Sequence, residues 1–241
     1  MSFTAFISDL HLTSARPRIN RIFFSFLEGP ALHADALYIL GDLFEYWAGD
    51  DDLVDPLNAQ VAAGLKAVRD AEVPVYLMRG NRDLLLLDGF ARASGSTFIA
   101  DPTIVDLYGT RTLLMHGDTL CTADERYQAF RRRAHSRLWQ RMFLAQPLRL
   151  RRAEIRYARR LSEAEKKTKA EYIMDVAPAA VDQVLRDSGS TRLIHGHTHR
   201  PARHAHVVDG RSCERWVLSD WYDHGDYLSV STQGCTPVRL D

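Results

Sequence analysis

Five times along this chain, a short apolar run ends abruptly on side chains that can bind a metal ion. The first run covers residues 3–12, FTAFISDLHL, and closes on an aspartate and a histidine two positions apart. Apolar runs of this length predict buried strands, and the polar residues that follow would lie at the carboxyl ends of those strands. Metal-type side chains end the five runs at Asp9, His11, Asp42, Asn81, His116, His197 and His199.

The segments between these runs decide the fold class. Strands are predicted at residues 36–40, 73–78, 112–115 and 191–194, and apolar residues at helical spacing predict helices at residues 18–32 and 57–71. Alternating strands and helices favour an α/β fold, in which ligands bind at the carboxyl ends of the strands. All the candidate metal ligands follow predicted strands in this way.

Bulk composition sets the class of protein. With 241 residues, of which 46% are hydrophobic and 26% charged, the chain suits one globular domain, with or without a large insertion. Its three widely spaced cysteines indicate neither a disulfide framework nor a thiolate zinc site. No signal peptide and no membrane-spanning apolar run stand out. We therefore expect a cytoplasmic protein, which could still rest on a membrane.

Each candidate ligand also has a simpler interpretation. An aspartate after a strand is more often a turn former or a helix cap, and His-x-His can be a solvated loop. Five such strand ends in one chain make coincidence a poor explanation. Carboxylate, imidazole and amide ligands without thiolate favour manganese, iron or zinc. A carboxylate such as Asp42 can bridge two divalent ions, which together activate water for attack on phosphorus.

The order of the motifs carries a resemblance. Asp9-Leu10-His11, Gly41-Asp42, residues 80–83 (GNRD), residues 116–118 (HGD) and residues 196–199 (GHTH) resemble the five signature blocks of the calcineurin-like metallophosphoesterases. The resemblance implies a two-sheet β-sandwich flanked by helices. It implies that one ion is held by Asp9, His11, Asp42 and His199, and the other by Asp42, Asn81, His116 and His197. His195 matches no ligand position, so we expect it either to have a structural role or to support the ligands from behind.

One departure from the superfamily pattern bears on the substrate. Most phosphoesterases of the superfamily carry histidine after Gly-Asn, whereas this chain has Arg82. Arginine is always charged and cannot protonate a leaving alkoxide. It can clamp phosphate by paired hydrogen bonds, which suits a pyrophosphate substrate whose leaving group is itself a phosphate.

Longer matches narrow the resemblance to one family. ISDLHL, GDLFEYWAGDD, GNRD, MHGDTLCTAD, IMDV, IHGHTHRP and VLSDW are together similar to the UDP-2,3-diacylglucosamine diphosphatases of lipid A biosynthesis. Ala123 departs from many relatives, which carry a second aspartate there. The likeness implies one metallophosphoesterase domain over residues 1–241, with a helical insertion, or cap, at about residues 123–187.

The implied reaction is hydrolysis of UDP-2,3-diacylglucosamine to UMP and 2,3-diacylglucosamine 1-phosphate (lipid X), by attack of activated water on the α-phosphorus. The implied cofactors are two divalent ions, usually Mn²⁺. The implied location is the cytoplasmic face of a Gram-negative inner membrane, with peripheral attachment to an anionic surface and without nucleic acid or an obligate protein partner. The catalytic residues would be Asn81, Arg82 and His116. The substrate contacts would fall on Asn81, Arg82, Asp124, Ser162, Lys166, Lys169 and His197.

The insertion is strongly basic. Residues 126–169 hold 15 Arg and Lys but only 3 acids, while the chain as a whole has 31 of each sign. The apolar spacing predicts one helix from Tyr127 to about Phe143 and a second over residues 156–176, with Ser162 in a capping box. The arginines could form a solvated helix face, or they could meet anionic lipid while the apolar stripe meets acyl chains. By contrast, Asp50, Asp51 and Asp52 are expected to form a solvated loop.

Two other function classes stay open at this point. A phosphodiesterase or nuclease of the same superfamily would also use a basic segment, although Arg82 and the apolar residues among the arginines argue against it. A metal-free scaffold would keep the fold and lose its ligands, and none of the ligands is missing here.

Overall fold

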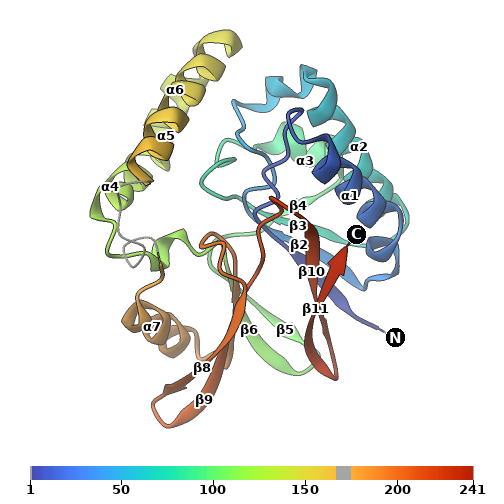
Figure 1. Ribbon diagram of the computed structural model, residues 1–241, viewed down its shortest axis with the longest axis vertical. Coiled ribbons are helices and arrows are strands. Elements are labelled where there is room, and N and C mark those ends of the chain that lie inside the picture. Colours follow the sequence, from blue (N-terminus) through green and yellow to red (C-terminus); the bar gives the residue numbers. More distant parts are fainter. Residues whose placement is uncertain (1, 167–174, 241) are drawn as a thin grey trace.

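The computed structural model describes residues 2–166 and 175–240, but only the backbone of residues 163–166. Two β-sheets face each other, and helices cover their outer surfaces (Figure 1). One sheet has six strands in the order β11-β10-β1-β2-β3-β4, and the other has five in the order β5-β6-β7-β9-β8. The predicted α/β class and two-sheet sandwich are confirmed.

The six-stranded sheet contains the first three predicted strands. β1 (Thr4–Ile7), β2 (Ala36–Leu40) and β3 (Val75–Met78) run parallel, and the two-residue β4 (Thr97–Phe98) continues beside β3. β10 (Gly225–Ser231) and β11 (Gly234–Leu240) complete the sheet as antiparallel strands. Its outer face is covered by α1 (Pro17–Glu28), α2 (Pro56–Asp70) and α3 (Asp88–Ser94), and the short helices η1 (Pro30–His33) and η2 (Asp50–Val54) lie between these elements in the chain.

The five-stranded sheet contains the last two predicted strands. β6 (Thr110–Met115), β7 (Arg192–His195) and β9 (Arg211–Val217) run parallel, whereas β5 (Thr103–Leu107) and β8 (Ala202–Val208) pair antiparallel at the two edges. The helix α7 (Pro178–Ser188) packs on the outer face through Val181 and Leu185.

Successive side chains of a strand point to opposite faces of its sheet, and this alternation explains how both faces of each sheet are buried. Leu37 and Ile39 of β2 face the outer helices, while Tyr38 and Leu40 join the core between the sheets. In β7, Leu193 faces α7 and Ile194 joins the inner core. Burial on both sides is why these strands read as continuous apolar runs in the sequence.

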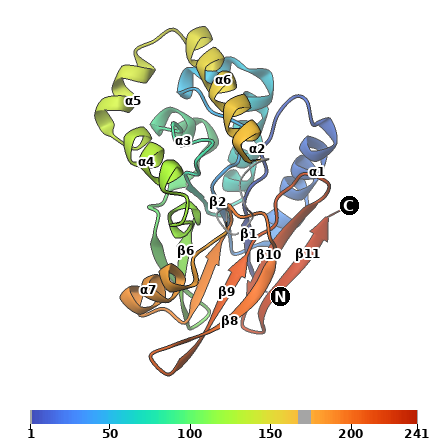
Figure 2. The same cartoon turned by 60° about the vertical axis from the view of Figure 1, so that its left-hand side comes forward.

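The basic segment forms three helices at one end of the sandwich: α4 (Glu125–Ala134), α5 (Arg137–Leu144) and α6 (Leu148–Lys166) (Figures 1 and 2). The short helix η3 (Asp118–Leu120) precedes them. We call α4, α5 and α6 the cap. Trp139 and Phe143 stack with ring centroids 5.0 Å apart and pack, with Ile155, against the core beneath the outer helices.

Two predictions for the cap were wrong. The expected single helix from Tyr127 is broken after Ala134, because Ser136 caps a new helix by accepting a hydrogen bond from the Trp139 amide (3.3 Å). The second helix begins at Leu148 instead of Arg156, so Ser162 lies inside α6 and cannot cap its start.

The acidic segment before α2 is solvated mainly at Asp51, whose side chain is 53% exposed, which corrects a third expectation for Asp50 and Asp52. Asp50 accepts hydrogen bonds from the Leu87 and Phe90 amides, and Asp52 is 1% exposed. Asp51 and Asp52 instead form ion pairs with Arg151 and Arg152 of α6. The acidic segment is therefore where the cap attaches to the sandwich.

Candidate metal centre

The five predicted strand ends meet at one edge of the sandwich. β1, β2 and β3 are parallel, as are β6 and β7, so the carboxyl ends within each set lie side by side. Backbone hydrogen bonds join the loops that follow, from the Asp9 amide to the Gly41 carbonyl (3.1 Å) and from the Gly196 amide to the His116 carbonyl (2.9 Å). The seven predicted ligands therefore share one region.

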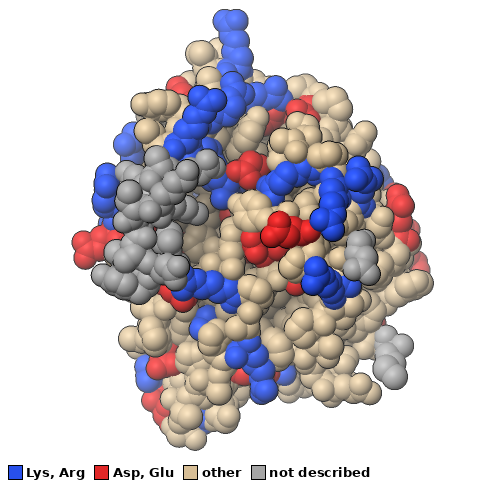
Figure 3. All heavy atoms as spheres, viewed as in Figure 1, with Lys and Arg blue, Asp and Glu red and all other residues tan. Residues whose placement is uncertain are grey.

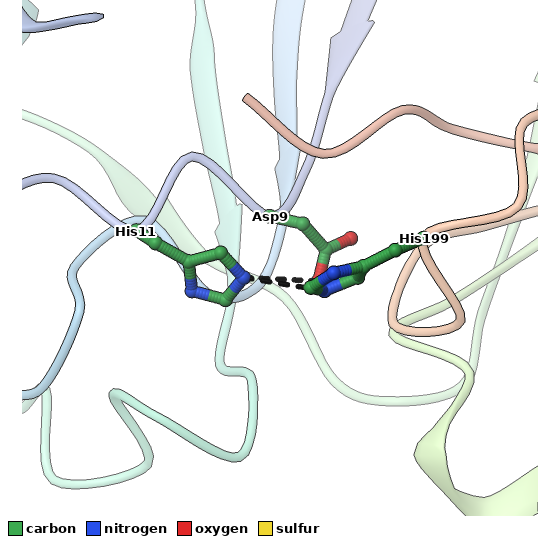
Figure 4. Close-up of side chains that lie close together, drawn as sticks. All are labelled: Asp9, His11 and His199. Atoms are coloured by element: carbon green, nitrogen blue, oxygen red, sulfur yellow. Dashed lines mark hydrogen bonds and ion pairs between the residues drawn. The ribbon is translucent and has the colours of Figure 1, made fainter. Parts of the chain in front are cut away.

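Asp9, His11 and His199 form the first ligand group (Figure 4). The Nε2 atoms of His11 and His199 are 3.2 Å apart, and they lie 4.0 and 3.4 Å from Oδ1 of Asp9. Bonds of about 2.0–2.2 Å from nitrogen and oxygen to a metal produce ligand separations of this size. Oδ1 of Asp9 is buried and has no hydrogen-bond partner among the described residues. These atoms fit one divalent cation.

The second ligand group centres on the side-chain oxygen of Asn81. This Oδ1 atom lies 3.1 Å from Nε2 of His116 and 3.0 Å from Nδ1 of His197. Asp42 lies between the two groups, because its Oδ1 is 3.8 Å from Nε2 of His116 and its Oδ2 is 3.9 Å from Nδ1 of His11. The carboxylate thus has one oxygen near a histidine of each group, and the His11 nitrogen nearest to it is Nδ1, not the Nε2 that faces Asp9 and His199.

Strained backbone accompanies the ligands. Eight described residues other than glycine have positive φ, and five of them are predicted ligands: Asp9, His11, Asp42, His197 and His199. Left-handed backbone costs free energy for such residues and persists where the surroundings enforce it, commonly at functional sites. The close approach of the Gly196 backbone to Asp9 is one such constraint, since a Cβ at Gly196 would lie 2.2 Å from the Asp9 carboxylate.

Burial and neighbouring charges shift the pKa values of the predicted ligands in both directions. Burial raises the pKa of Asp42 to about 7, and the neighbouring carboxylates of Asp9 and Asp83 add to the rise. For His116, burial opposes the charged form, but the carboxylates of Asp42 and Asp118 outweigh it and raise the pKa to about 9. Burial and Arg82 hold the pKa of His11 well below its ordinary value, so His11 is the neutral imidazole that metal binding needs.

Several supporting residues were not singled out from the sequence. Asp83 accepts hydrogen bonds from the amides of Leu43 (2.7 Å) and Gly80 (2.8 Å), which ties the loop after β3 to the loop after β2. Asp220 lies 3.5 Å from Nδ1 of His199, the ring nitrogen that faces away from Asp9. A carboxylate in this position orients a histidine ligand. The VLSDW motif was the available signal for Asp220.

His195 has the structural position that the sequence indicated. It is fully buried, and its Nδ1 lies 2.8 Å from the Gly196 carbonyl. Burial lowers its pKa to about 4, which keeps the ring neutral.

The predicted substrate contacts lie at different places. Arg82 is 6% exposed, and its Nε lies 3.7 Å from Oδ2 of Asp42. Asp124 caps α4 by accepting a hydrogen bond from the Tyr127 amide (3.1 Å). Ser162 is exposed on α6. The side chain of Lys166 and the whole of Lys169 lie outside the described residues.

The comparisons with known proteins agree with this geometry. The family described as calcineurin-like phosphoesterase matches residues 4–201. The chain is 53% identical to the UDP-2,3-diacylglucosamine hydrolase of Aromatoleum aromaticum over 98% of this chain and 95% of that one. It is 52% identical to the protein of that name from Cellvibrio japonicus, over 96% of both chains. A solved archaeal phosphodiesterase, 11% identical over 99% of both chains with a TM-score of 0.48, is too distant to bear on function.

Proposed function

Because the chain belongs to the calcineurin-like phosphoesterases, we propose that it hydrolyses the pyrophosphate bond of UDP-2,3-diacylglucosamine in lipid A biosynthesis. Water attacks the α-phosphorus, and the oxygen between the two phosphorus atoms leaves with the sugar phosphate. The products are UMP and 2,3-diacylglucosamine 1-phosphate. The identity of more than half the residues to hydrolases of this name, over nearly the whole chain, is the observation that carries the proposal.

Two divalent cations would be held by the two ligand groups. Asp9, His11 and His199 would hold one, Asn81, His116 and His197 the other, and Asp42 would contribute to both. When bound, such ions lower the pKa of water and neutralise charge on phosphoryl oxygens. Oxygen and imidazole ligands without thiolate support Mn²⁺ as the ion used.

Arg82 would bind the diphosphate next to these ions. Its guanidinium is nearly buried beside Asp42, and the carboxylates of Asp42 and Glu45 raise its pKa even though burial lowers it. It therefore keeps its charge throughout the reaction. The Arg82 amide also donates to Oδ1 of Asp42 (2.8 Å), which holds the arginine against the bridging carboxylate. Asn81 and His197 contact the same phosphates, and His116 completes the catalytic group.

The cap would bind the acylated sugar and rest on the membrane, as an insertion within a single domain. Among the described residues, no helix is long and apolar enough to cross a membrane. Arginines run along α5 and α6 in Figure 3. Large apolar side chains lie exposed among them, including Leu138 (69%) and Met142 (66%). This combination supports peripheral association with the anionic cytoplasmic face of the inner membrane. By the family resemblance, Asp124, Ser162, Lys166 and Lys169 would also contact the substrate.

The experiment compares three substrates with Mn²⁺ present. We expect UMP release from UDP-2,3-diacylglucosamine to exceed cleavage of bis(p-nitrophenyl) phosphate and of single-stranded DNA. A strong preference for DNA would overturn the proposal in favour of a nuclease. Metal analysis separates the enzyme from a scaffold: the wild type should carry metal, and Asp42→Ala should lose both metal and activity.

A further inference from the structure

Glu45 gathers three arginines that come from separate parts of the chain. Nη2 of Arg16, in the loop after β1, donates to its Oε2 at 3.1 Å. Nη1 of Arg82, after β3, and Nη2 of Arg159, in α6, both donate to its Oε1, the second at 3.0 Å. We call Glu45 and these three arginines the Glu45 cluster. Glu45 is thus one of the carboxylates at which the sandwich and the cap meet.

The cluster lies against the metal centre. Arg82 connects it to the bridging Asp42 at 3.7 Å. Arg16 also donates to the carbonyl of His11, and its guanidinium lies over the ring of Tyr222, 4.7 Å from the ring centroid. The same Tyr222 ring stacks on His11 with centroids 5.4 Å apart. The cluster is therefore adjacent to both ligand groups.

The position of Glu45 is itself fixed by the backbone. Its amide donates to the Leu12 carbonyl (3.1 Å), and two residues later the Trp47 amide donates to the Arg82 carbonyl (3.1 Å). Both loops that supply Arg16 and Arg82 are thus bound to the Glu45 loop. The side chains of Arg16, Arg82, Glu45 and Arg159 are 21%, 6%, 24% and 20% exposed, so an incoming ligand can still reach the cluster.

Charge decides which ligand the cluster suits. Three guanidinium groups outnumber the two carboxylates they pair with, Glu45 and Asp42, so the cluster has a positive excess beside the candidate metal centre. Without Glu45 the three cations would repel one another and spread apart. With Glu45 they stay together at positions where guanidinium forks bind phosphate oxygens.

We propose that Glu45 is a positioning residue that keeps Arg16, Arg82 and Arg159 assembled as a binding site for the diphosphate of the substrate. The inference deepens the proposed function and rests on it for the identity of the substrate. A carboxylate here has two opposite effects on an anionic ligand: it repels the charge, and it organises the arginines that bind it. The organisation of the three arginines by Glu45 outweighs its repulsion of the anionic ligand.

The test replaces Glu45 with an isosteric neutral residue, Glu45→Gln, and measures binding as well as turnover. Binding of methylenediphosphonate, a diphosphate that cannot be hydrolysed, is followed by calorimetry with the Mn²⁺-loaded protein. We expect roughly 10-fold weaker binding and a kcat for UDP-2,3-diacylglucosamine about 10- to 100-fold lower, as misplaced binding groups produce. Metal content should match the wild type, and the variant should remain folded.

Two comparisons make the result decisive. Glu154→Gln, the same substitution at an exposed glutamate of α6, should change neither quantity. Arg16→Gln combined with Glu45→Gln should cost less than the sum of the two single effects, because Glu45 acts partly through Arg16. Tighter diphosphonate binding by Glu45→Gln with unchanged kcat would overturn the proposal and make Glu45 a simple counter-ion.

The outcomes also separate this inference from the proposed function. If the wild type hydrolyses UDP-2,3-diacylglucosamine and Glu45→Gln behaves identically, only the inference fails. If the wild type fails to hydrolyse that substrate while Glu45→Gln weakens diphosphonate binding, the proposed function fails and the diphosphate site stands.

Discussion

Replacing Asp83 with asparagine should lower both the free energy of unfolding and the affinity for metal, because Asp83 supports the loops that carry the predicted ligands. Asp83 is fully buried and accepts three backbone hydrogen bonds, from Leu43 (2.7 Å) and Phe44 (3.3 Å) on Oδ2 and from Gly80 (2.8 Å) on Oδ1. Asparagine has a single acceptor oxygen. If that oxygen serves Leu43 and Phe44, the side-chain NH₂ group must face the Gly80 amide.

The loss in free energy of unfolding follows from the number of hydrogen bonds that asparagine cannot accept. A hydrogen bond to a charged acceptor contributes about 1.5–3 kcal/mol, and a buried donor left without a partner costs about 1–3 kcal/mol. Removing the charge offsets part of this loss in free energy of unfolding. Burial raises the pKa of Asp83 and so disfavours its charged form, and the substitution removes a carboxylate from the vicinity of Asp42. We expect a net loss of about 2–3 kcal/mol in the free energy of unfolding.

The assay is urea denaturation of metal-free protein, followed by Mn²⁺ titration of the folded variant. The freed Gly80 amide lies next to Asn81, so Mn²⁺ affinity should fall by roughly 10-fold or more, as it does when support behind a ligand is lost. Asp70→Asn is the matched control, since Asp70 makes an exposed pair with Lys66 worth about 0.5 kcal/mol at most. A free energy of unfolding for Asp83→Asn within 0.5 kcal/mol of the wild type would refute the reasoning.

Three further predictions concern the metal ligands, the substrate and the membrane. Asp220→Asn should lower Mn²⁺ affinity by roughly 10- to 100-fold, because Nδ1 of His199 loses its carboxylate partner; equal affinity in a calorimetric titration would contradict this. Arg82→His should keep the metal content but lower turnover of UDP-2,3-diacylglucosamine by roughly 100-fold, and unchanged turnover would show that the arginine is dispensable. Leu138→Gln with Met142→Gln should weaken binding to phosphatidylglycerol vesicles by roughly 10-fold in a sedimentation assay, since both substitutions remove exposed apolar area that a membrane would cover. Val207→Gln, at an exposed residue of β8, is the control, and equal vesicle binding by all three proteins would exclude the cap as the contact surface.

The central strands were readable because they are buried on both faces. The strand over Ala36–Leu40 was predicted to the residue, and the other four predicted strands differ from β1, β3, β6 and β7 only at their ends. The strands β4, β5, β8, β9, β10 and β11 were not predicted. The gathering of Asp9, Asp42 and His116 followed from parallel strands whose carboxyl ends meet. The sandwich itself came from the motif resemblance, because spacing alone indicates strands without assigning them to one sheet or two.

The backbone conformation of the predicted ligands could not be predicted from the sequence. Positive φ at Asp9, His11 and His199 is imposed by neighbouring segments, such as the Gly196 backbone against Asp9 and the Trp221 amide that donates to the Asp9 carbonyl (3.0 Å). These contacts join residues that are far apart in the sequence. The helix break at Ser136 was missed for a local reason, because this one serine caps a new helix although the apolar spacing continues past it.

The uneven charge of the chain has an explanation inside the molecule as well as outside it. An acidic body and a basic segment suggested an anionic partner, yet carboxylates of the body are among the partners that the basic cap meets. Arg131 pairs with Asp118, Arg151 with Asp51, Arg152 with Asp52 and Arg159 with Glu45. Two of these carboxylates, Asp118 and Glu45, belong to loops that also carry metal ligands. The cap is therefore attached at the metal centre and at the acidic segment before α2, and its charge should not be taken as a signature of nucleic-acid binding. These pairs hold the cap against the sandwich, so the proposed contact of its exposed apolar side chains with a membrane would be made from this attached position.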